Sequence, residues 1–267
     1  MSAVVLATVL FCTPARAQGQ PRTAPEASEA PDLASDIIDP TAELFQLNLF
    51  YEWIGDHHDA RAAGYLDDDA HAVIFRPVFP IRLWGQVNVL RVSTSYDLDT
   101  VMNTSGLDGT EAFDLLVFEQ AWGRWAVGPV VRFAPRPDPA AGETEEEEDS
   151  FQVGPALAAV VLAGSWTFGA FNQNFFAEET QRSQLQPIIG YGISPWLSVS
   201  NGDMQIVWDY GQGSLSSLPL SVQANLVHPL FGQAIRWSVN PQYNLIRDQG
   251  LRSWSVVFGS TLLASPN

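Results

Sequence analysis

The sequence predicts an all-β fold, an up-and-down antiparallel transmembrane β-barrel of about twelve strands. Three observations predict this fold. Apolar and polar residues alternate within segments about ten residues long, which is the length that a tilted strand needs to cross a bilayer. Short and long connections take turns along the chain, and aromatic residues gather at both ends of the segments. Each feature is typical of a barrel that sits in lipid.

The composition agrees with a chain that is apolar but not helical. Hydrophobic residues make up 46% of the 267 residues and charged residues only 16%, whereas soluble domains carry about 25% charge. The longest apolar run covers residues 1–14, shorter than the ~20 residues of a membrane-spanning helix. The formal net charge of −17 excludes nucleic acid as a partner, because a phosphate backbone needs a basic surface.

The first residues indicate export. Ser2 to Phe11 form a short apolar region, and Ala15-Arg16-Ala17 fits a cleavage site between small residues, although no Lys or Arg precedes the apolar region. We expect a signal peptide at 1–17, the alternative being a buried N-terminal helix. Residues 18–36 are rich in Pro, Ala, Glu and Ser and predict a flexible periplasmic tail. The barrel would occupy 37–267 in the bacterial outer membrane.

The alternation is clearest at residues 235–245, where apolar residues at odd positions alternate with polar residues at even positions. This period of two gives a strand one apolar and one polar face. Val87 to Ser95 fits less well, because Arg91 falls on the apolar face, which indicates a bulge or an error of register. The predicted strands are 44–54, 72–82, 85–95, 111–121, 125–134, 151–162, 166–176, 184–193, 196–210, 218–228, 234–246 and 252–263.

The connections follow a rule of parity. Those after even-numbered strands are short and predict periplasmic turns, whereas those after odd-numbered strands are mostly longer and polar and predict external loops. Tryptophans at the short turns and aromatic residues near the other end would form two belts at the membrane interfaces; the alternative is that the tryptophans form a core. Four strands also contain a proline, which removes one donor from the hydrogen-bond ladder. The short-turn tryptophans are Trp84, Trp122, Trp166 and Trp196, and the prolines are Pro77, Pro129, Pro187 and Pro241.

An ordered set of short motifs accompanies this pattern. The motifs are Asp39-Pro40, Phe75 to Ile81, Val127-Gly128-Pro129-Val130, Val153-Gly154-Pro155-Ala156, Gly164 to Ala170 and Leu185 to Tyr191. On these motifs the chain resembles the outer-membrane transporter β-barrel family of proteobacteria, which is related to the phenol meta-pathway outer-membrane proteins and has some members misnamed "neuromedin U". The resemblance covers most of residues 37–263. It implies an outer-membrane barrel with a transport role and no established substrate.

The inward faces of the predicted strands supply the candidate lumen. Charges that face inward avoid the ~2–4 kcal/mol that an Arg or Lys costs on the lipid side at the bilayer midplane, so folding alone can account for their position. A role in transport is the second interpretation. The candidate lumen-lining residues are Glu52, Arg76, Asp114, Arg132, Gln186, Asp209, Gln223, Asn225, Arg236, Asn240, Gln242 and Asn244.

Two loops hold clusters of charge. Glu143, Glu145, Glu146, Glu147, Glu148 and Asp149 form an acidic loop at the predicted pore mouth. This loop is either a disordered, self-repelling segment or a source of negative potential that enriches cations. Asp56-His57-His58-Asp59, with Asp67 to Asp69 and His71, contains metal-binding residue types, but their spacing matches no rigid site. We therefore expect no metal and no cofactor.

The sequence also predicts no catalytic site. An outer-membrane phospholipase would place His and Ser two residues apart on one strand face, and none of the four histidines has a serine two residues later. The leading hypothesis is a passive channel or transporter for small solutes. Its rivals are a closed structural or interaction barrel and a soluble secreted β-sandwich or lectin. The expected partners are outer-membrane lipid, the barrel assembly machinery and a small-molecule solute.

Overall fold

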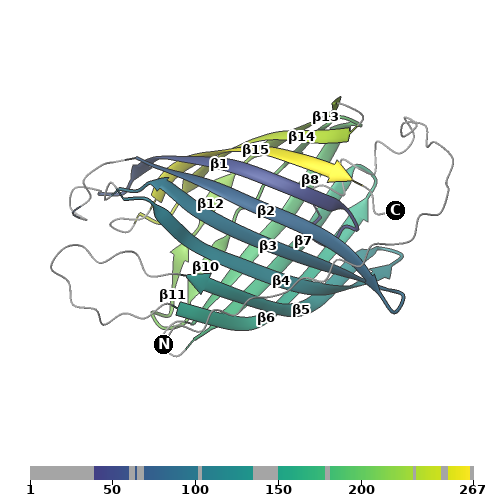
Figure 1. The fold of residues 1–267 in the computed structure, drawn as a ribbon, viewed down its shortest axis with the longest axis horizontal. Coiled ribbons are helices and arrows are strands. Elements are labelled where there is room, and N and C mark those ends of the chain that lie inside the picture. The colour runs from purple at the N-terminus through teal and green to yellow at the C-terminus, as the bar shows by residue number, and fades with distance from the viewer. Residues whose placement is uncertain are drawn as a thin grey trace.

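The chain folds as a closed antiparallel β-barrel of twelve spanning strands, which confirms the predicted fold class (Figure 1). The computed structural model describes residues 39–59, 64, 69–101, 104–134, 150–177, 181–230, 233–247 and 252–264. The predicted signal peptide, the tail and the acidic loop lie outside these residues. Within them, no helix is long and apolar enough to cross a membrane.

Ten of the spanning strands are continuous, and two are broken into shorter pieces. The continuous strands are β1 (Phe45–His57), β2 (Ala70–Leu83), β3 (Gln86–Asp99), β4 (Gly106–Gln120), β5 (Gly123–Ala134), β6 (Ser150–Ala163), β7 (Trp166–Phe176), β8 (Gln181–Ser194), β14 (Gln233–Asn244) and β15 (Arg252–Ala264). The ninth spanning strand consists of β9 (Leu197–Ser200) and β10 (Ile206–Asp209). The tenth consists of β11 (Ser214–Ser217), β12 (Pro219–Ser221) and β13 (Gln223–Leu230).

Each spanning strand pairs with its neighbours in the chain, and the last pairs with the first. The ladder between β1 and β15 runs from Phe45↔Ala264 to His57↔Arg252 and closes the ring. At the broken strands, β8 pairs with both β9 and β10, β9 pairs with β13, and β14 pairs with both β12 and β13. Closure leaves no exposed sheet edge, as a barrel in lipid requires.

The two ends of the barrel differ, as the parity of the connections predicted. Two-residue turns follow β2, β4, β6 and β8, and they lie at what we call the short-turn end. The turn after β2 consists of Trp84 (φ 51°) and Gly85 (φ 81°), and two left-handed residues in succession suit the twist of a tight hairpin. The connections 58–69, 100–105, 135–149 and 177–180 join strand ends on the opposite side of the barrel, which we call the long-loop end.

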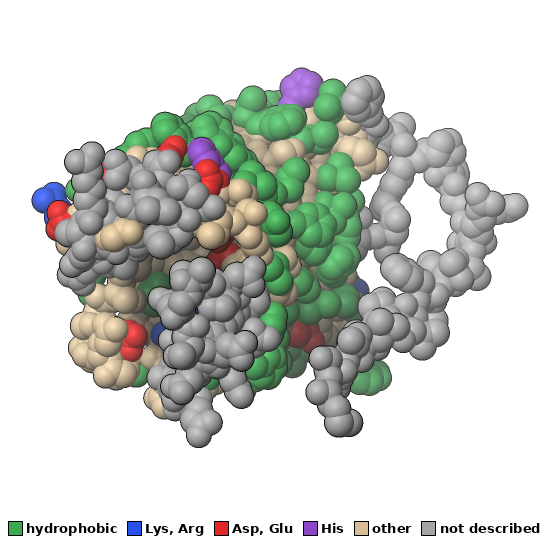
Figure 2. Space-filling view, turned by 60° about the vertical axis from the view of Figure 1, so that its left-hand side comes forward, with side chains coloured by type: hydrophobic (Ala, Val, Ile, Leu, Met, Phe, Trp, Pro, Cys, Tyr) green, Lys and Arg blue, Asp and Glu red, His purple; other side chains and the backbone are tan. Residues whose placement is uncertain are grey.

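The outer wall is apolar. Large hydrophobic side chains such as Leu49, Leu157 and Trp237 are about half exposed there. Figure 2 shows this apolar surface over the strands, with several charged side chains toward the long-loop end. A surface of this kind is unusual for a soluble monomer, whose exposed apolar patches stay small.

The interior has one apolar side and one polar side. Side chains of β2 to β8 form a buried apolar cluster inside the barrel, whereas the inward faces of β1, β13, β14 and β15 carry mainly amides, hydroxyls and charges. The apolar cluster contains Val78, Val89, Phe113, Leu115, Val117, Ala126, Val130, Ala156, Ala158, Val160, Phe171, Phe175 and Ile188.

Residues 39–44, which we call the N-terminal plug, lie inside the short-turn end. Ala42 and Leu44 pack against Val227 and Leu263 from the inward faces of β13 and β15. The Asp39 side chain is fully buried, accepts a 2.7 Å hydrogen bond from the Thr41 amide and lies 3.4 Å from the Arg124 guanidinium. These contacts fix the plug to opposite sides of the wall.

The strand prolines coincide with gaps in the ladders. Between β4 and β5 the pairing passes from Phe113↔Val130 to Leu116↔Val127 and omits Pro129. Similar gaps occur at Pro77 between β2 and β3, and at Pro155 between β6 and β7. A proline has no N–H to donate, so each of these residues occupies a site where the ladder needs no donor.

Candidate functional site

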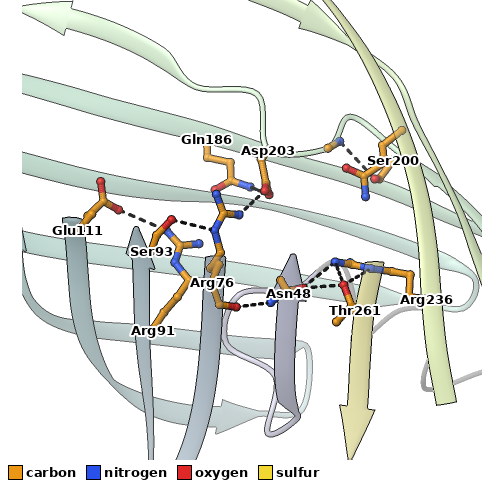
Figure 3. A network of polar contacts seen from close by, with 12 residues as sticks. Asn48, Arg76, Arg91, Ser93, Glu111, Gln186, Ser200, Asp203, Arg236 and Thr261 are labelled. Carbon is orange, nitrogen blue, oxygen red and sulfur yellow. Dashed lines mark hydrogen bonds and ion pairs between the residues drawn. The ribbon is translucent and has the colours of Figure 1, made fainter. Parts of the chain in front are cut away.

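An ion pair crosses the lumen near the middle of the barrel. Arg76 extends inward from β2, and its guanidinium contacts the carboxylate of Asp203, which lies between β9 and β10 on the far wall (Figure 3). The Gln186 amide donates a 3.3 Å hydrogen bond to the other Asp203 oxygen. Arg76 Nε donates to Ser93 Oγ at 3.3 Å, and its guanidinium lies 5.1 Å from the centre of the Phe50 ring. We call Arg76 and Asp203 the cross-lumen pair.

Asp203 reaches the lumen because the ninth spanning strand turns inward at residues 201–205. The Asn201 side chain takes the place of the missing backbone partner: its Oδ1 accepts from the Ile189 amide at 2.8 Å, and its Nδ2 donates to the Pro187 carbonyl at 2.7 Å. Pro187 itself needs no partner for an N–H. Gly202 has φ +63°, and a Cβ there would lie 2.4 Å from the Asn240 side chain. The inward turn therefore needs glycine at this position.

Two further arginines stand in the same interior. Arg91 of β3 lies 3.4 Å from Glu111 and 4.2 Å from the Phe113 ring, and Glu111 also accepts from Gln173 at 2.7 Å. Arg236 of β14 donates to Thr261 at 2.7 Å and to Asn48 at 3.0 Å (Figure 3). Asn48 in turn donates to the Arg76 carbonyl at 2.7 Å, which links this group to the strand that carries the cross-lumen pair.

The cross-lumen pair divides the interior into two chambers. A small chamber of about 70 Å³ lies toward the short-turn end and is bordered by the N-terminal plug. A larger chamber of about 370 Å³ lies toward the long-loop end, within the range of ligand pockets in proteins. Phe50, Arg76, Asp203 and Gln223 line both chambers. In the larger chamber, Glu52 and Arg252 form a second ion pair along one wall.

The structure places eleven of the twelve predicted lumen residues on inward-facing positions. Glu52, Gln186, Gln223, Asn225, Arg236, Asn240 and Asn244 are buried in the interior, Arg76 and Gln242 line the larger chamber, and Arg132 and Asp209 occupy inward-facing positions of their strands.

The remaining residue, Asp114, was placed on the wrong face. It is exposed, whereas its neighbours Phe113 and Leu115 are 2% and 0% exposed. The inward face of β4 is apolar because it packs in the interior cluster, so the rule that polar residues face the lumen gives the wrong side here. Asp114 lies on the outer wall.

Of the two explanations offered for Arg91, a bulge or an error of register, the bulge is absent. The pairing of β3 with β4 runs without a break from Val87 to Ser95. Val89 and Arg91 both face inward. The side of this strand that the sequence interpretation took as the outer, apolar face is therefore its inner face. The sequence interpretation also missed Asp203 and Glu111. For Asp203 a signal was present, because Asn201-Gly202-Asp203 is a turn-forming sequence inside the predicted strand 196–210.

The histidines do not gather into a recognisable centre. In the described parts of the chain, no group of three or more His, Cys, Asp or Glu could hold a metal ion, and Asp67 and Asp68 lie outside those parts. His71 lies on the outer face of β2, where its ring contacts the Tyr51 hydroxyl at 2.8 Å and lies 3.6 Å from Asp69. Neither neighbour is a serine.

By its fold and its apolar outer wall, the chain belongs to the class of up-and-down β-barrels. Comparison with protein-family models and with curated proteins finds no match. Among solved structures, the chain is similar to outer membrane phospholipase A from Escherichia coli, with 12% identity, a TM-score of 0.48, and 84% of this chain and 97% of that chain covered.

Two other solved structures are similar at comparable or lower levels. The dimer of the Salmonella typhi outer membrane phospholipase with bound calcium has 12% identity and a TM-score of 0.48, covering 83% of this chain and 90% of that chain. A mutant of the porin of Rh. blastica has 9% identity and a TM-score of 0.28, covering 83% and 99%. At these values the likenesses assign no function, and the transporter family that the sequence resembles stays a prediction.

Proposed function

We propose that this protein is an outer-membrane β-barrel that passes small solutes by passive diffusion, without catalysis, and that two closures in series control its lumen. The closures are the N-terminal plug at the short-turn end and the cross-lumen pair at mid-height. The observation that carries the proposal is the larger chamber of about 370 Å³ at the long-loop end. The cross-lumen pair and the N-terminal plug separate this chamber from the short-turn end. Such closures can open without any change in the barrel wall.

The outer wall supports the membrane location. Exposed aromatic residues lie near the short turns, as Trp84, Trp122 and Trp166 do, and Trp208 and Tyr210 lie toward the other end. Between these two belts of aromatic residues, the exposed residues of the outer wall are mainly aliphatic. This arrangement fits a bilayer with an interface at each end. We infer that the short-turn end faces the periplasm and the long-loop end faces outward.

Planar-bilayer conductance tests the proposal. Four proteins are compared: the wild type, a variant lacking residues 39–44, the double variant Arg76→Ala/Asp203→Ala, and the combination of both changes. Because two closures in series each block the path, we expect large, steady conductance only in the combined variant. The wild type should show small or brief openings.

A matched control separates opening of the path from loss of charge. Glu52 and Arg252 form an ion pair of the same type, but they lie on the adjacent strands β1 and β15 and do not cross the lumen. The variant Glu52→Ala/Arg252→Ala, combined with deletion of residues 39–44, should remain closed. Equal conductance from both pairs of substitutions would contradict the role of the cross-lumen pair.

A second candidate function is a closed structural or interaction barrel. The observation that favours it is the apolar cluster from β2 to β8, which fills one side of the interior with packed side chains. In barrels of about eight strands such side chains fill the whole lumen, whereas 16–18 strands leave an aqueous channel. Absence of conductance in the combined variant, with a folded barrel, would favour the closed barrel over the channel.

A further inference from the structure

Two residues in the wall of the larger chamber carry buried polar atoms that have no hydrogen-bond partner among the described residues. Asn240 and Ser255 are 3% and 0% exposed, and neither Asn240 Oδ1 nor Ser255 Oγ has a partner among the described residues. Both residues line the chamber. The register of β14 and β15 pairs Asn240 with Val257 and Gln242 with Ser255, so the two unpartnered side chains are diagonal neighbours on one inward face. Side chains in this relation are close enough to contact the same small molecule.

The charges of the chamber are already neutralised within the protein. Among the described residues that line it, four are charged, and they form two ion pairs, Glu52 with Arg252 and Arg76 with Asp203. An anionic or cationic solute would have to separate one of these pairs to gain a counter-charge, and it would lose its own hydration on entry. Half of the residues that line the chamber carry a hydroxyl or a primary amide. This lining favours a solute that is uncharged and rich in hydrogen-bonding groups.

An apolar strip lies beside the unpartnered polar groups. Phe50 and Ile74 are paired across β1 and β2, and Val257 of β15 follows on the same inward side. Val257 also pairs directly with Asn240. The chamber therefore presents C–H surface and hydrogen-bonding groups side by side. A sugar ring has the same two features, because its axial C–H groups form an apolar face and its hydroxyls form a polar edge.

We propose that the larger chamber is a binding site for an uncharged polyhydroxylated molecule of about monosaccharide size, with Asn240 and Ser255 bonding its hydroxyls and the Phe50–Ile74–Val257 strip contacting its ring. The inference deepens the proposed channel function and rests on it for the biological meaning of the site. A wholly apolar solute fits less well, because it would leave Asn240 Oδ1 and Ser255 Oγ buried without partners.

Equilibrium binding to the detergent-folded wild type is the test. Saturation-transfer NMR and titration calorimetry are run with three probes that share a pyranose ring: D-glucose, D-glucuronate and D-glucosamine. We expect saturable binding of D-glucose in the millimolar range and binding of the two charged probes at least several-fold weaker. No saturable binding of D-glucose, or equal binding of all three probes, would overturn the proposal.

Two variants locate the site. Asn240→Leu should weaken D-glucose binding about fivefold to tenfold, the loss expected for one hydrogen bond. The control is Gln152→Met, because Gln152 is 4% exposed, also has an unpartnered amide oxygen, and lies on β6 outside the chamber. If Asn240→Leu does not fold, the smaller change Ser255→Ala replaces it, with a loss of about twofold to fivefold. Unchanged binding in a folded chamber variant would overturn the assignment.

These measurements separate the two proposals. Binding is measured at equilibrium and does not depend on an open path, whereas the channel is tested by conductance. A protein that conducts in the combined variant but binds no sugar would retain the channel and lose the binding site. A protein that binds D-glucose but never conducts would retain the site and lose the channel.

Discussion

Replacing Gly202 by alanine tests whether the ninth strand turns into the lumen as the structure has it. Gly202 has φ +63°, a conformation that is left-handed and unfavourable for residues with a Cβ. The added Cβ would lie 2.4 Å from Asn240 Nδ2 and 2.9 Å from Gln223 Oε1. The substitution therefore combines backbone strain with crowding of two buried side chains that line the larger chamber.

The expected magnitude follows from these two contributions. The left-handed backbone costs an alanine about 1–2 kcal/mol, offset by about 0.4–1 kcal/mol because alanine restricts the unfolded chain more than glycine does. Asn240 must also move by about 1 Å to restore ordinary contact, and crowding of this kind costs about 1–3 kcal/mol. We expect Gly202→Ala to lower the free energy of unfolding by about 2–4 kcal/mol.

Gly213 provides a matched control. Its φ is +66°, but a Cβ there would meet nothing within 4 Å, so Gly213→Ala carries the backbone strain alone and should cost about 1 kcal/mol. Urea unfolding of the lipid-inserted barrel, followed by tryptophan fluorescence, measures both values. In the background lacking residues 39–44, Gly202→Ala should also raise conductance, because it disturbs the segment that carries Asp203. Equal destabilisation by the two substitutions would refute the inward turn.

Three further predictions address the plug, the outer wall and the orientation. Asp39→Ala removes the acceptor of the 2.7 Å bond from the Thr41 amide and the ion pair with Arg124. Hydrogen exchange of the Thr41 amide should therefore accelerate about fivefold to tenfold. An unchanged exchange rate would mean that the plug is held by Ala42 and Leu44 alone. Asp114→Leu should stabilise the inserted barrel by about 1 kcal/mol, since a charge on the lipid side is unfavourable. Glu52→Leu, at a buried inward position, should destabilise the barrel. A loss of stability with Asp114→Leu would contradict an outward Asp114. In a Cys12→Ser background, Gly213→Cys should react with an impermeant thiol reagent on intact cells, and Gly164→Cys should react only after lysis. The two sites are matched because both glycines have a positive φ and open space for a side chain. The reverse result would invert the orientation.

The sequence was sufficient for the wall of the barrel but less so for its interior. Strand number and turn parity could be predicted because both depend on local signals, namely alternation of period two within strands and the succession of short and long connections between them. The strands extend further than predicted at the long-loop end, as in β3, which reaches Asp99, and β8, which begins at Gln181. Polar residues such as Asp97 and Arg182 continue the ladders there, and alternation of apolar and polar residues weakens where a strand leaves the apolar zone.

The interior was harder to predict because it follows two rules at once. On β14 the polar residues face inward, as in Arg236 and Asn240, but on β4 the inward residues are Phe113 and Leu115. A single strand cannot reveal which rule applies to it, since the answer depends on the strands across the lumen. Asp114 was misplaced for this reason, and Glu111 was missed. The contact of Arg76 with Asp203 joins residues 127 positions apart, and no local pattern encodes such a pair.

The break in the ninth strand gives up part of the regular hydrogen-bond ladder of the barrel wall in exchange for a charged side chain in the lumen. A continuous strand from Leu197 to Asp209 would complete the ladder with β8 and would carry no residue far into the lumen. Instead Asn201 satisfies the backbone groups of Pro187 and Ile189 with its own side chain, and the released residues carry Asp203 to Arg76. The local sequence suits the inward turn at three points: Asn201 provides a side-chain amide that bonds to β8, Gly202 adopts the left-handed backbone, and Pro187 has no N–H to satisfy. Departures from regular structure that are compensated in this way are expected at functional positions, so the cross-lumen pair is where variation of function should be sought first.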